Sequence, residues 1–353
     1  MSNLQKVSGH HHFHVLRTVE EVRRWMKDLE NPESVGFVPT MGALHSGHLQ
    51  LVRHSVSNQC HTVVSIFLNP AQFAPSEDLS SYPITLESDL AKLNELAVRP
   101  GSYPIPHNSF DGSVTLDETK EESTDESSAE RVVSAVFLPT KDVLYPSGIE
   151  PVVEEQKGAF VIVHGLSEQL EGARRPGFFR GVATVVLKLF MIVQPSLAFF
   201  GQKDLQQCFV VRQLCKDFHI IRPGSIVVVP TVRDHSSGLA LSSRNVYLSE
   251  IETISAKALF KFLRQCACQL ATSQETPSVE ELSKVFKPPT DSISLDFVSL
   301  NSPIDFSEIL PGTGTKDLAF VVSGAILVKC QKDGQTVRLI DNIVINHDLN
   351  SSI

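Results

Sequence analysis

The chain has no long uninterrupted apolar run and no cluster of basic residues. The nearest approach to an apolar run, residues 182–193, is interrupted by Lys188, so it favours a buried helix over a membrane span. The formal net charge of −9 argues against a nucleic-acid partner, because contacts with phosphates require clustered positive charge. These absences exclude membrane-spanning and nucleic-acid-binding proteins and leave a globular protein.

Two kinds of signal for secretion are also missing. The six cysteines lack the spacing of a disulfide framework, and the N-terminus lacks the basic-then-apolar order of a secretory signal. We therefore expect a reducing compartment, the cytoplasm by default, with the mitochondrion left open because the first residues contain few acids. Residues 10–12 and His14 form a histidine-rich stretch before the first periodic segment, and we expect it to be a mobile tail.

The first 230 residues alternate between strand-like and helix-like segments, as in a parallel sheet covered by helices. A chain of 353 residues with 42% hydrophobic residues can hold two such cores. We therefore expect an α/β fold in which residues 14–230 form a Rossmann-like domain. The predicted strands are 35–38, 62–68, 135–138, 160–163, 197–200 and 226–229, and the predicted helices are 86–96, 181–193, 205–218 and one that begins near residue 49.

Beyond Pro230 the pattern changes. A predicted long helix, about 249–271, leads through a proline-containing link to strand-like segments. These segments are 296–300, 318–322, 326–330 and 337–340, with a hairpin-turn sequence at 332–334. They predict a smaller α+β domain, residues 231–353, that covers the nucleotide.

One segment, residues 111–131, breaks the globular composition. It holds eight acidic residues against two basic ones, many serines and threonines, and few large apolar side chains. Such a segment cannot bury enough apolar surface to offset the entropy lost on ordering. We therefore expect a disordered insertion in the first domain, in preference to a partner-binding segment.

The first chemical motif is PTMGALHSGH, residues 39–48, between a predicted strand and a predicted helix. Gly42 and Gly47 let the backbone approach a ligand closely, and the start of the following helix can seat a phosphate. His45 and His48, three residues apart, can donate hydrogen bonds to a phosphoryl group as charge develops on it. A zinc site or simple packing also explains two such histidines, although no third metal ligand lies nearby.

Two further motifs follow predicted strands at their carboxyl ends, where ligands gather in open α/β sheets. In NPAQF, residues 69–73, the amides of Asn69 and Gln72 can hold a hydroxyl or a carboxylate, although a plain turn explains them as well. In FGQKDLQQ, residues 200–207, Lys203 can neutralise triphosphate oxygens and Asp204 can accept from ribose hydroxyls.

Arginines mark the two remaining motifs. Arg175 lies in EGARRPGFFRGV, residues 171–182, where a surface arginine is an equal alternative to a ligand-binding one. The loop at 230–245 ends in Ser242, Ser243 and Arg244, whose hydroxyls and guanidinium suit β- and γ-phosphates. Its lack of lysine, together with the acidic net charge, argues against an enzyme that acts on tRNA.

The HxGH pattern at 45–48 resembles the signature of the HIGH-motif nucleotidyl transferases, and the wider string at 38–48 resembles its pantothenate synthetase form. All five motifs, in the same order from residue 35 to about 248, carry this resemblance; beyond that point it is fainter. Two residues depart from it. Phe178 stands where members of that family often have histidine, and Gln202 stands where they have glutamate. One extra residue near 236–237 lengthens the loop after Val232.

The resemblance implies a ligase that condenses pantoate with β-alanine, using ATP, through a pantoyl-adenylate. Triphosphate chemistry implies Mg²⁺, although the sequence shows no convincing set of protein ligands for it. The resemblance also implies a homodimer. The implied catalytic residues are His48, His45, Lys203 and Arg244. The implied ATP-binding residues are Met41, Gly42, Ala43, Leu44, His45, Ser46, Gly47, His48, Gly201, Gln202, Lys203, Asp204, Val232, Leu241, Ser242, Ser243 and Arg244. The implied residues for the organic substrates are Gln72, Gln207, Asn69 and Arg175.

Two other functions stay open at this point. One is another small-molecule nucleotidyl transferase, which would join a nucleotide to a phosphate ester. The other is a nucleotide-binding regulator without activity, against which the intact His45, His48, Lys203 and Arg244 argue.

Overall fold

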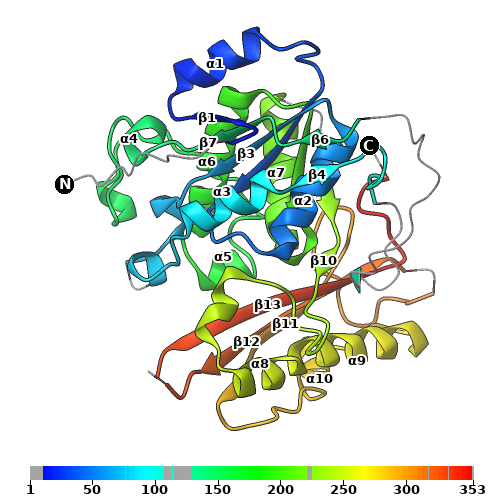
Figure 1. Cartoon of the computed structure of the whole chain (residues 1–353). Helices are drawn as coiled ribbons and strands as arrows, with labels where there is room; N and C mark the ends of the chain where they lie inside the picture. Colours follow the sequence, from blue (N-terminus) through cyan, green and yellow to red (C-terminus); the bar gives the residue numbers. More distant parts are fainter. Residues whose placement is uncertain are drawn as a thin grey trace.

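A parallel sheet of six strands forms the larger part of the molecule (Figure 1). The computed structural model describes residues 11–75, 77–106, 113–114, 129–220, 225–316, 318–332 and 334–351. The order of the strands across the sheet is β1 (His14–Leu16), β7 (Ala135–Phe137), β3 (His61–Ile66), β2 (Val35–Thr40), β8 (Leu197–Gly201) and β9 (Ile226–Val229). The predicted α/β fold with a parallel sheet is confirmed.

Helices cover both faces of this sheet, which explains why its strands are continuous apolar runs in the sequence. Successive strand residues point to opposite faces. Phe37 and Phe200 therefore belong to one core, and Val38 and Phe199 to the other. The first core also takes side chains from α1 (Val19–Lys27), α6 (Phe178–Val193) and α7 (Leu205–Phe218), and the second from α2 (Ser46–Asn58) and α3 (Leu86–Asn94).

The chain reverses its direction across the sheet next to β2. From β2 it continues to β3 and β7 on one side, and then returns to β8 on the other side of β2. The loops that leave β2 and β8 therefore diverge and open a crevice at the carboxyl ends of the strands. This crevice is where ligands bind in open α/β sheets.

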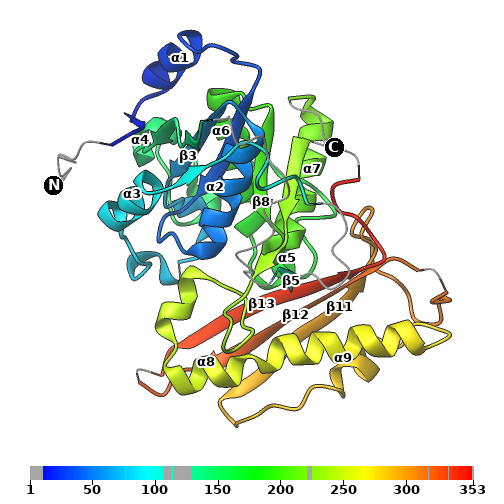
Figure 2. The same ribbon diagram turned by 45° about the vertical axis from the view of Figure 1, so that its right-hand side comes forward.

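A separate antiparallel sheet packs below the first one (Figure 2). It consists of β11 (Ile293–Asn301), β12 (Phe320–Lys329) and β13 (Thr336–Ile345), and α9 (Ala258–Thr272) lies along its outer face. α8 (Glu250–Ala256) and α10 (Val279–Ser283) flank that helix. The smaller α+β part predicted after Pro230 is confirmed as this sheet with its helices.

Two details of this smaller part differ from the prediction. The segments 318–322 and 326–330 are one strand, β12, that passes through Gly324. A Cβ at this position would lie 3.1 Å from Leu263 of α9, so the glycine serves close helix packing and does not break the strand. The helix predicted over 249–271 is two helices, α8 and α9, which meet at Lys257.

Two predictions for the first part were also wrong. His14 is not in a tail, because it begins β1 and pairs with Ala135 of β7. Residues 160–163 form no strand: the Val161 N–H donates to Thr184 Oγ1 at 2.9 Å instead of joining the sheet. Most of the acidic insertion lies outside the described residues; within it, β5 (Ser113–Val114) pairs with β10 (Thr231–Val232).

The remaining elements are short. β4 (Ala97–Val98) pairs with β6 (Arg131–Val132), and α4 (Lys141–Leu144) and α5 (Glu171–Arg174) precede α6. The 3₁₀ helices include η1 (Pro70–Gln72), η2 (Asp78–Ser80), η3 (Val153–Glu155), η4 (Gln202–Asp204) and η6 (Ser243–Tyr247). No helix in the described part of the chain is long and apolar enough to span a membrane. None of the six cysteines, all of which lie in described segments, is in a disulfide.

Candidate active site

A cavity of about 770 Å³ opens at the carboxyl ends of β2, β3, β8 and β9 and extends to β13. Sixteen of the residues predicted to bind ligands line it, although up to about 200 positions separate them in the chain. These residues are Met41, His45, Gly47, His48, Asn69, Gln72, Arg175, Gly201, Lys203, Asp204, Gln207, Val232, Leu241, Ser242, Ser243 and Arg244. The fold therefore brings all five motifs to one cavity.

The loop after β2 contains three residues that lie away from this cavity, Gly42, Ala43 and Leu44. The buried carboxylate of Asp89, on α3, accepts hydrogen bonds from the Ala43 and Leu44 N–H groups at 2.9 and 2.8 Å. Gly42 has φ +89°, a conformation that favours glycine. These three residues, and Ser46 at the start of α2, shape the loop and do not line the cavity.

His45 and His48 lie side by side at the N-terminus of α2, with ring centroids 4.0 Å apart. His45 Nδ1 accepts a hydrogen bond from the Gly47 N–H at 3.1 Å, and His48 Nδ1 accepts one from the His45 N–H at 3.4 Å. A neutral imidazole whose Nδ1 accepts carries its proton on Nε2. Each ring therefore carries its N–H at Nε2, where it can donate to a ligand in the cavity.

Both histidines are neutral at physiological pH. Burial, the adjacent His48 and the charge of Lys203 lower the pKa of His45 to about 2. Burial and the charges of Lys203 and Lys92 lower the pKa of His48 to about 4. The pair therefore acts on a ligand as hydrogen-bond donors and not as imidazolium cations.

Asn69 and Gln72 form one hydrogen-bonded unit after β3. Asn69 Nδ2 donates to Gln72 Oε1 at 2.8 Å and to the Gly181 carbonyl at 3.1 Å. The Tyr145 hydroxyl donates to Asn69 Oδ1 at 2.8 Å, and burial raises the pKa of this phenol, so it stays protonated. With its acceptor satisfied inside the protein, Gln72 presents its NH₂ group, which suits a hydroxyl or carboxylate oxygen.

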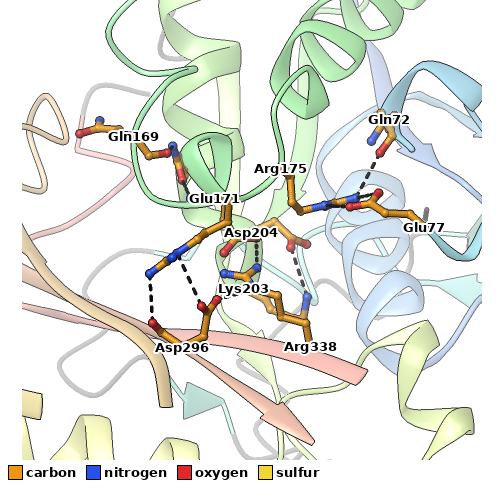
Figure 3. Close-up of polar contacts among 11 residues, drawn as sticks. Gln72, Glu77, Gln169, Glu171, Arg175, Lys203, Asp204, Asp296 and Arg338 are labelled. Atoms are coloured by element: carbon orange, nitrogen blue, oxygen red, sulfur yellow. Dashed lines mark hydrogen bonds and ion pairs between the residues drawn. The ribbon is translucent and has the colours of Figure 1, made fainter. Parts of the chain in front are cut away.

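Adjacent carboxylates on one loop hold two arginines of the cavity. Glu77 accepts from Arg175 Nε at 2.6 Å and Nη2 at 2.7 Å, and Arg175 Nη2 also donates to the Gln72 carbonyl (Figure 3). Asp78 accepts from Arg244 Nε at 3.1 Å and Nη2 at 2.8 Å. Burial alone would raise the pKa of Asp78, but its bond to Arg244 outweighs burial and lowers it.

Lys203 and Asp204 lie together in η4 at the end of β8, with Lys203 Nζ 3.2 Å from Asp204 Oδ1 (Figure 3). The side chain of Gln202 points away from the cavity and is buried against β13, where its Nε2 donates to Asn342 Oδ1 at 3.2 Å. Gln207, one helical turn beyond Lys203, is half-buried in the cavity wall.

β13 and β11 supply the opposite wall of the cavity. Arg338 of β13 donates to Glu171 and, from Nε, to Asp296 Oδ2 at 2.7 Å (Figure 3). Arg174 Nε lies 3.5 Å from Oδ1 of the same aspartate. This charged cluster joins α5 of the first part to the antiparallel sheet.

Comparison with known proteins decides the family. The family model for pantoate-beta-alanine ligase matches residues 14–344. The chain belongs to this family. The pantoate-beta-alanine ligase of Saccharomyces cerevisiae is 39% identical over 347 residues, which cover 94% of this chain and 99% of that protein. The pantothenate synthetase of Shewanella loihica is 39% identical over 92% of this chain and 94% of that protein.

Solved structures of pantothenate synthetases have the same fold. A crystal structure from Thermus thermophilus superposes with a TM-score of 0.69 at 32% identity, covering 94% of this chain and 98% of that one. The pantoate-beta-alanine ligase of Francisella tularensis, solved with beta-gamma ATP and beta-alanine, has a TM-score of 0.62 at 29% identity and covers 94% and 97%.

Several residues that line this cavity or hold its side chains were not found from the sequence. Tyr145, Glu77 and Asp78 hold predicted site residues, yet each lies outside the five motifs. Asn342 and Arg338 come from β13, in the part of the chain where the motif resemblance is faint. The only signal available for Glu77 and Asp78 was their position shortly after Gln72, in a short acidic pair.

Proposed function

We propose that this chain condenses pantoate with β-alanine in an ATP-dependent reaction that releases AMP and pyrophosphate. Family membership supports the overall reaction, and one observation on this chain carries its mechanism. Two neutral, partly buried histidines face a cavity that also contains Lys203, Arg244 and the Asn69–Gln72 unit. Such a cavity offers donors for a phosphoryl group, cations for a triphosphate, and amides for a polar acid.

The reaction needs activation because a carboxylate is a poor acyl donor. A pantoate carboxylate oxygen attacks the α-phosphorus of ATP, the bond to the β-phosphate oxygen breaks, and pyrophosphate leaves. The β-alanine amine then attacks the carbonyl of the mixed anhydride, loses a proton, and AMP departs. No protein nucleophile is required, so the chain contributes positioning and charge stabilisation.

Each group has a role in this scheme. The Nε2–H groups of His45 and His48 donate to the α-phosphate oxygens, whose negative charge is greatest in the transition state. Lys203 and Arg244 hold the β- and γ-phosphates that leave as pyrophosphate. Gln72 and Gln207 orient pantoate by hydrogen bonds to its hydroxyl and carboxylate oxygens. The other predicted ATP contacts, Met41, Gly47, Gly201, Asp204, Val232, Leu241, Ser242 and Ser243, surround the nucleotide.

Mg²⁺ is part of this proposal as the counterion of ATP. The described residues contain no group of three or more His, Cys, Asp or Glu side chains placed to hold a metal. Mg²⁺ commonly binds through substrate phosphates with one or two carboxylates. Asp204 lines the cavity, and its carboxylate, which pairs with Lys203 in this structure, would be shared with the ion in such a role. The ion would neutralise charge on the triphosphate.

Pyrophosphate release with each organic substrate omitted in turn tests the proposal. We expect pantoate and ATP alone to support exchange of labelled pyrophosphate into ATP, and β-alanine to be needed only for pantothenate. Exchange that is independent of pantoate would favour a different nucleotidyl transferase. A protein that binds ATP and catalyses neither reaction would be a nucleotide-binding regulator.

We further propose a homodimer of this chain, as the family resemblance implies, which light scattering coupled to size-exclusion chromatography measures directly. Six cysteines without a disulfide fit a reducing compartment, the cytoplasm or the mitochondrial matrix. Imaging of the tagged chain distinguishes these two.

A further inference from the structure

The two faces of strand β13 pack against different parts of the molecule. Val337, Leu339 and Ile343 pack in the core under α9, whereas Val344 packs in the core of the large sheet. Because side chains alternate along a strand, Arg338 and Asn342 point to the same side as Val344, toward the first part of the molecule. Arg338 contacts α5 and Asn342 contacts η4.

The side chain of Asn342 forms three hydrogen bonds with the turn that contains Gln202 and Lys203. Its Nδ2 donates to the Gln202 carbonyl at 2.8 Å and to the Lys203 carbonyl at 3.1 Å. Its Oδ1 accepts from Gln202 Nε2 at 3.2 Å. Asn342 is 2% exposed and Gln202 is 1% exposed, so the two bonds between these residues are shielded from water.

The neighbouring residue on β13 anchors the other nucleotide loop. Asp341 accepts two hydrogen bonds from Arg233, whose guanidinium also stacks 3.6 Å from the centre of the Phe260 ring. Arg233 directly follows Val232 in the loop that ends at Arg244. Two successive residues of one strand thus hold the loops that carry Lys203 and Arg244.

We propose that Asn342 is a positioning residue for adenylate formation: its amide fixes the Gln202–Lys203 turn so that Lys203 meets the triphosphate. The proposal rests on the ligase function proposed above. Asn342 has no free donor to offer a substrate group, because both Nδ2 hydrogens serve the two carbonyls. Its effect passes through Lys203, whose displacement by about 1 Å would cost roughly 100-fold in rate.

Asn342→Asp tests the proposal, and Asn350→Asp is its matched control. Asn350 is also 2% exposed, accepts one hydrogen bond from the Val228 N–H, and donates Nδ2 to the Val228 and Pro106 carbonyls. Each substitution therefore removes two donated bonds to backbone carbonyls, one buried and one partly buried, and leaves the accepting oxygen in place. Asn350 lies outside the residues that line the cavity.

The readouts are the melting temperature, the steady-state kinetics of pantoate-dependent pyrophosphate release, and calorimetry of ATP binding without pantoate. We expect both variants to melt earlier. In Asn342→Asp we expect kcat to fall about tenfold or more and ATP to bind more weakly, with KM for pantoate within about twofold of the parent. In Asn350→Asp we expect all three ligand parameters to stay within about twofold.

Equal kinetics in the two variants would overturn the proposal, as would a loss confined to KM for pantoate. If Asn342→Asp does not fold, Asn342→Ala and Asn350→Ala form a second pair that removes the same donors without adding a charge. An inactive parent protein would contradict the proposed ligase function. The calorimetric comparison would then still decide whether Asn342 supports nucleotide binding.

Discussion

Arg244 forms a bidentate ion pair with Asp78, at 2.8 and 3.1 Å, in the cavity where it is proposed to hold phosphates. The preceding residue, Glu77, forms the equivalent pair with Arg175. Two consecutive residues, Glu77 and Asp78, thus each accept two hydrogen bonds from the guanidinium group of an arginine. The two arginines come from different motifs. An anionic ligand must compete with these carboxylates for the same donors.

We therefore predict that Asp78→Asn lowers KM for ATP by about two- to fivefold, because an amide competes for Arg244 less strongly than a carboxylate. Steady-state kinetics with varied ATP measure this change. Glu77→Gln is the matched control: it releases Arg175, beside Gln72, and is expected to change KM for pantoate while leaving that for ATP unaltered. A higher KM for ATP in Asp78→Asn would mean that Asp78 orients Arg244 and does not compete with ATP.

The activity should not fall when the pH is lowered through 6.5, the usual pKa of histidine. The pKa of His45 is lowered to about 2 and that of His48 to about 4, so both rings stay neutral donors as the pH falls from 8 to about 5. We expect kcat/KM for pyrophosphate release, which reports the ionisation of the free enzyme, to be flat over this interval with respect to these two groups. Initial rates in short assays, with the fold checked by circular dichroism, measure it. A halving of kcat/KM close to pH 6.5 that disappears in His48→Gln would contradict this assignment.

Gln202→Glu is predicted to lower both thermal stability and kcat. The new carboxylate would face Asn342 Oδ1, which now accepts from Gln202 Nε2 in a fully buried position. Two buried oxygens without a hydrogen between them cost about 1–3 kcal/mol. Gln202→Met removes the same bond without a charge and should have the smaller effect on the melting temperature. Equal melting temperatures for the parent and Gln202→Glu would show that Asn342 reorients at no cost.

Tyr145→Phe should raise KM for pantoate about tenfold with little loss of stability. The Tyr145 hydroxyl donates to Asn69 Oδ1, and Asn69 in turn donates to Gln72 Oε1, so the substitution loosens the side chain proposed to bind pantoate. The removed group is a single hydroxyl whose bond contributes about 1 kcal/mol. Kinetics with varied pantoate measure the effect, and KM for ATP serves as the internal control. An unchanged KM for pantoate would separate Tyr145 from the substrate site.

The sequence alone determined five of the six strands of the first sheet, β2, β3, β7, β8 and β9, and the motif loops, because the information for both is local. A strand buried on both faces is a run of β-branched and aromatic residues, and polar residues directly after it must lie at the carboxyl edge. The order of residues along the chain was therefore enough to assign His45, Lys203 and Asn69 to one edge. Where local signals conflict with packing, the prediction was wrong. Residues 318–322 and 326–330 were predicted as separate segments, but they form one strand, in which the missing side chain of Gly324 allows close contact with Leu263.

Only the tertiary structure decided how the motif residues are held. Asn342 and Gln202 are separated by 140 positions, and Arg244 and Asp78 by 166, and no periodicity in the chain links either pair. Their contact depends on the packing of the antiparallel sheet against the carboxyl ends of the parallel one. The neutrality of His45 and His48 has the same origin, because burial is the largest cause of both pKa shifts. Burial is a property of the assembled cavity, and a spacing of three residues does not encode it.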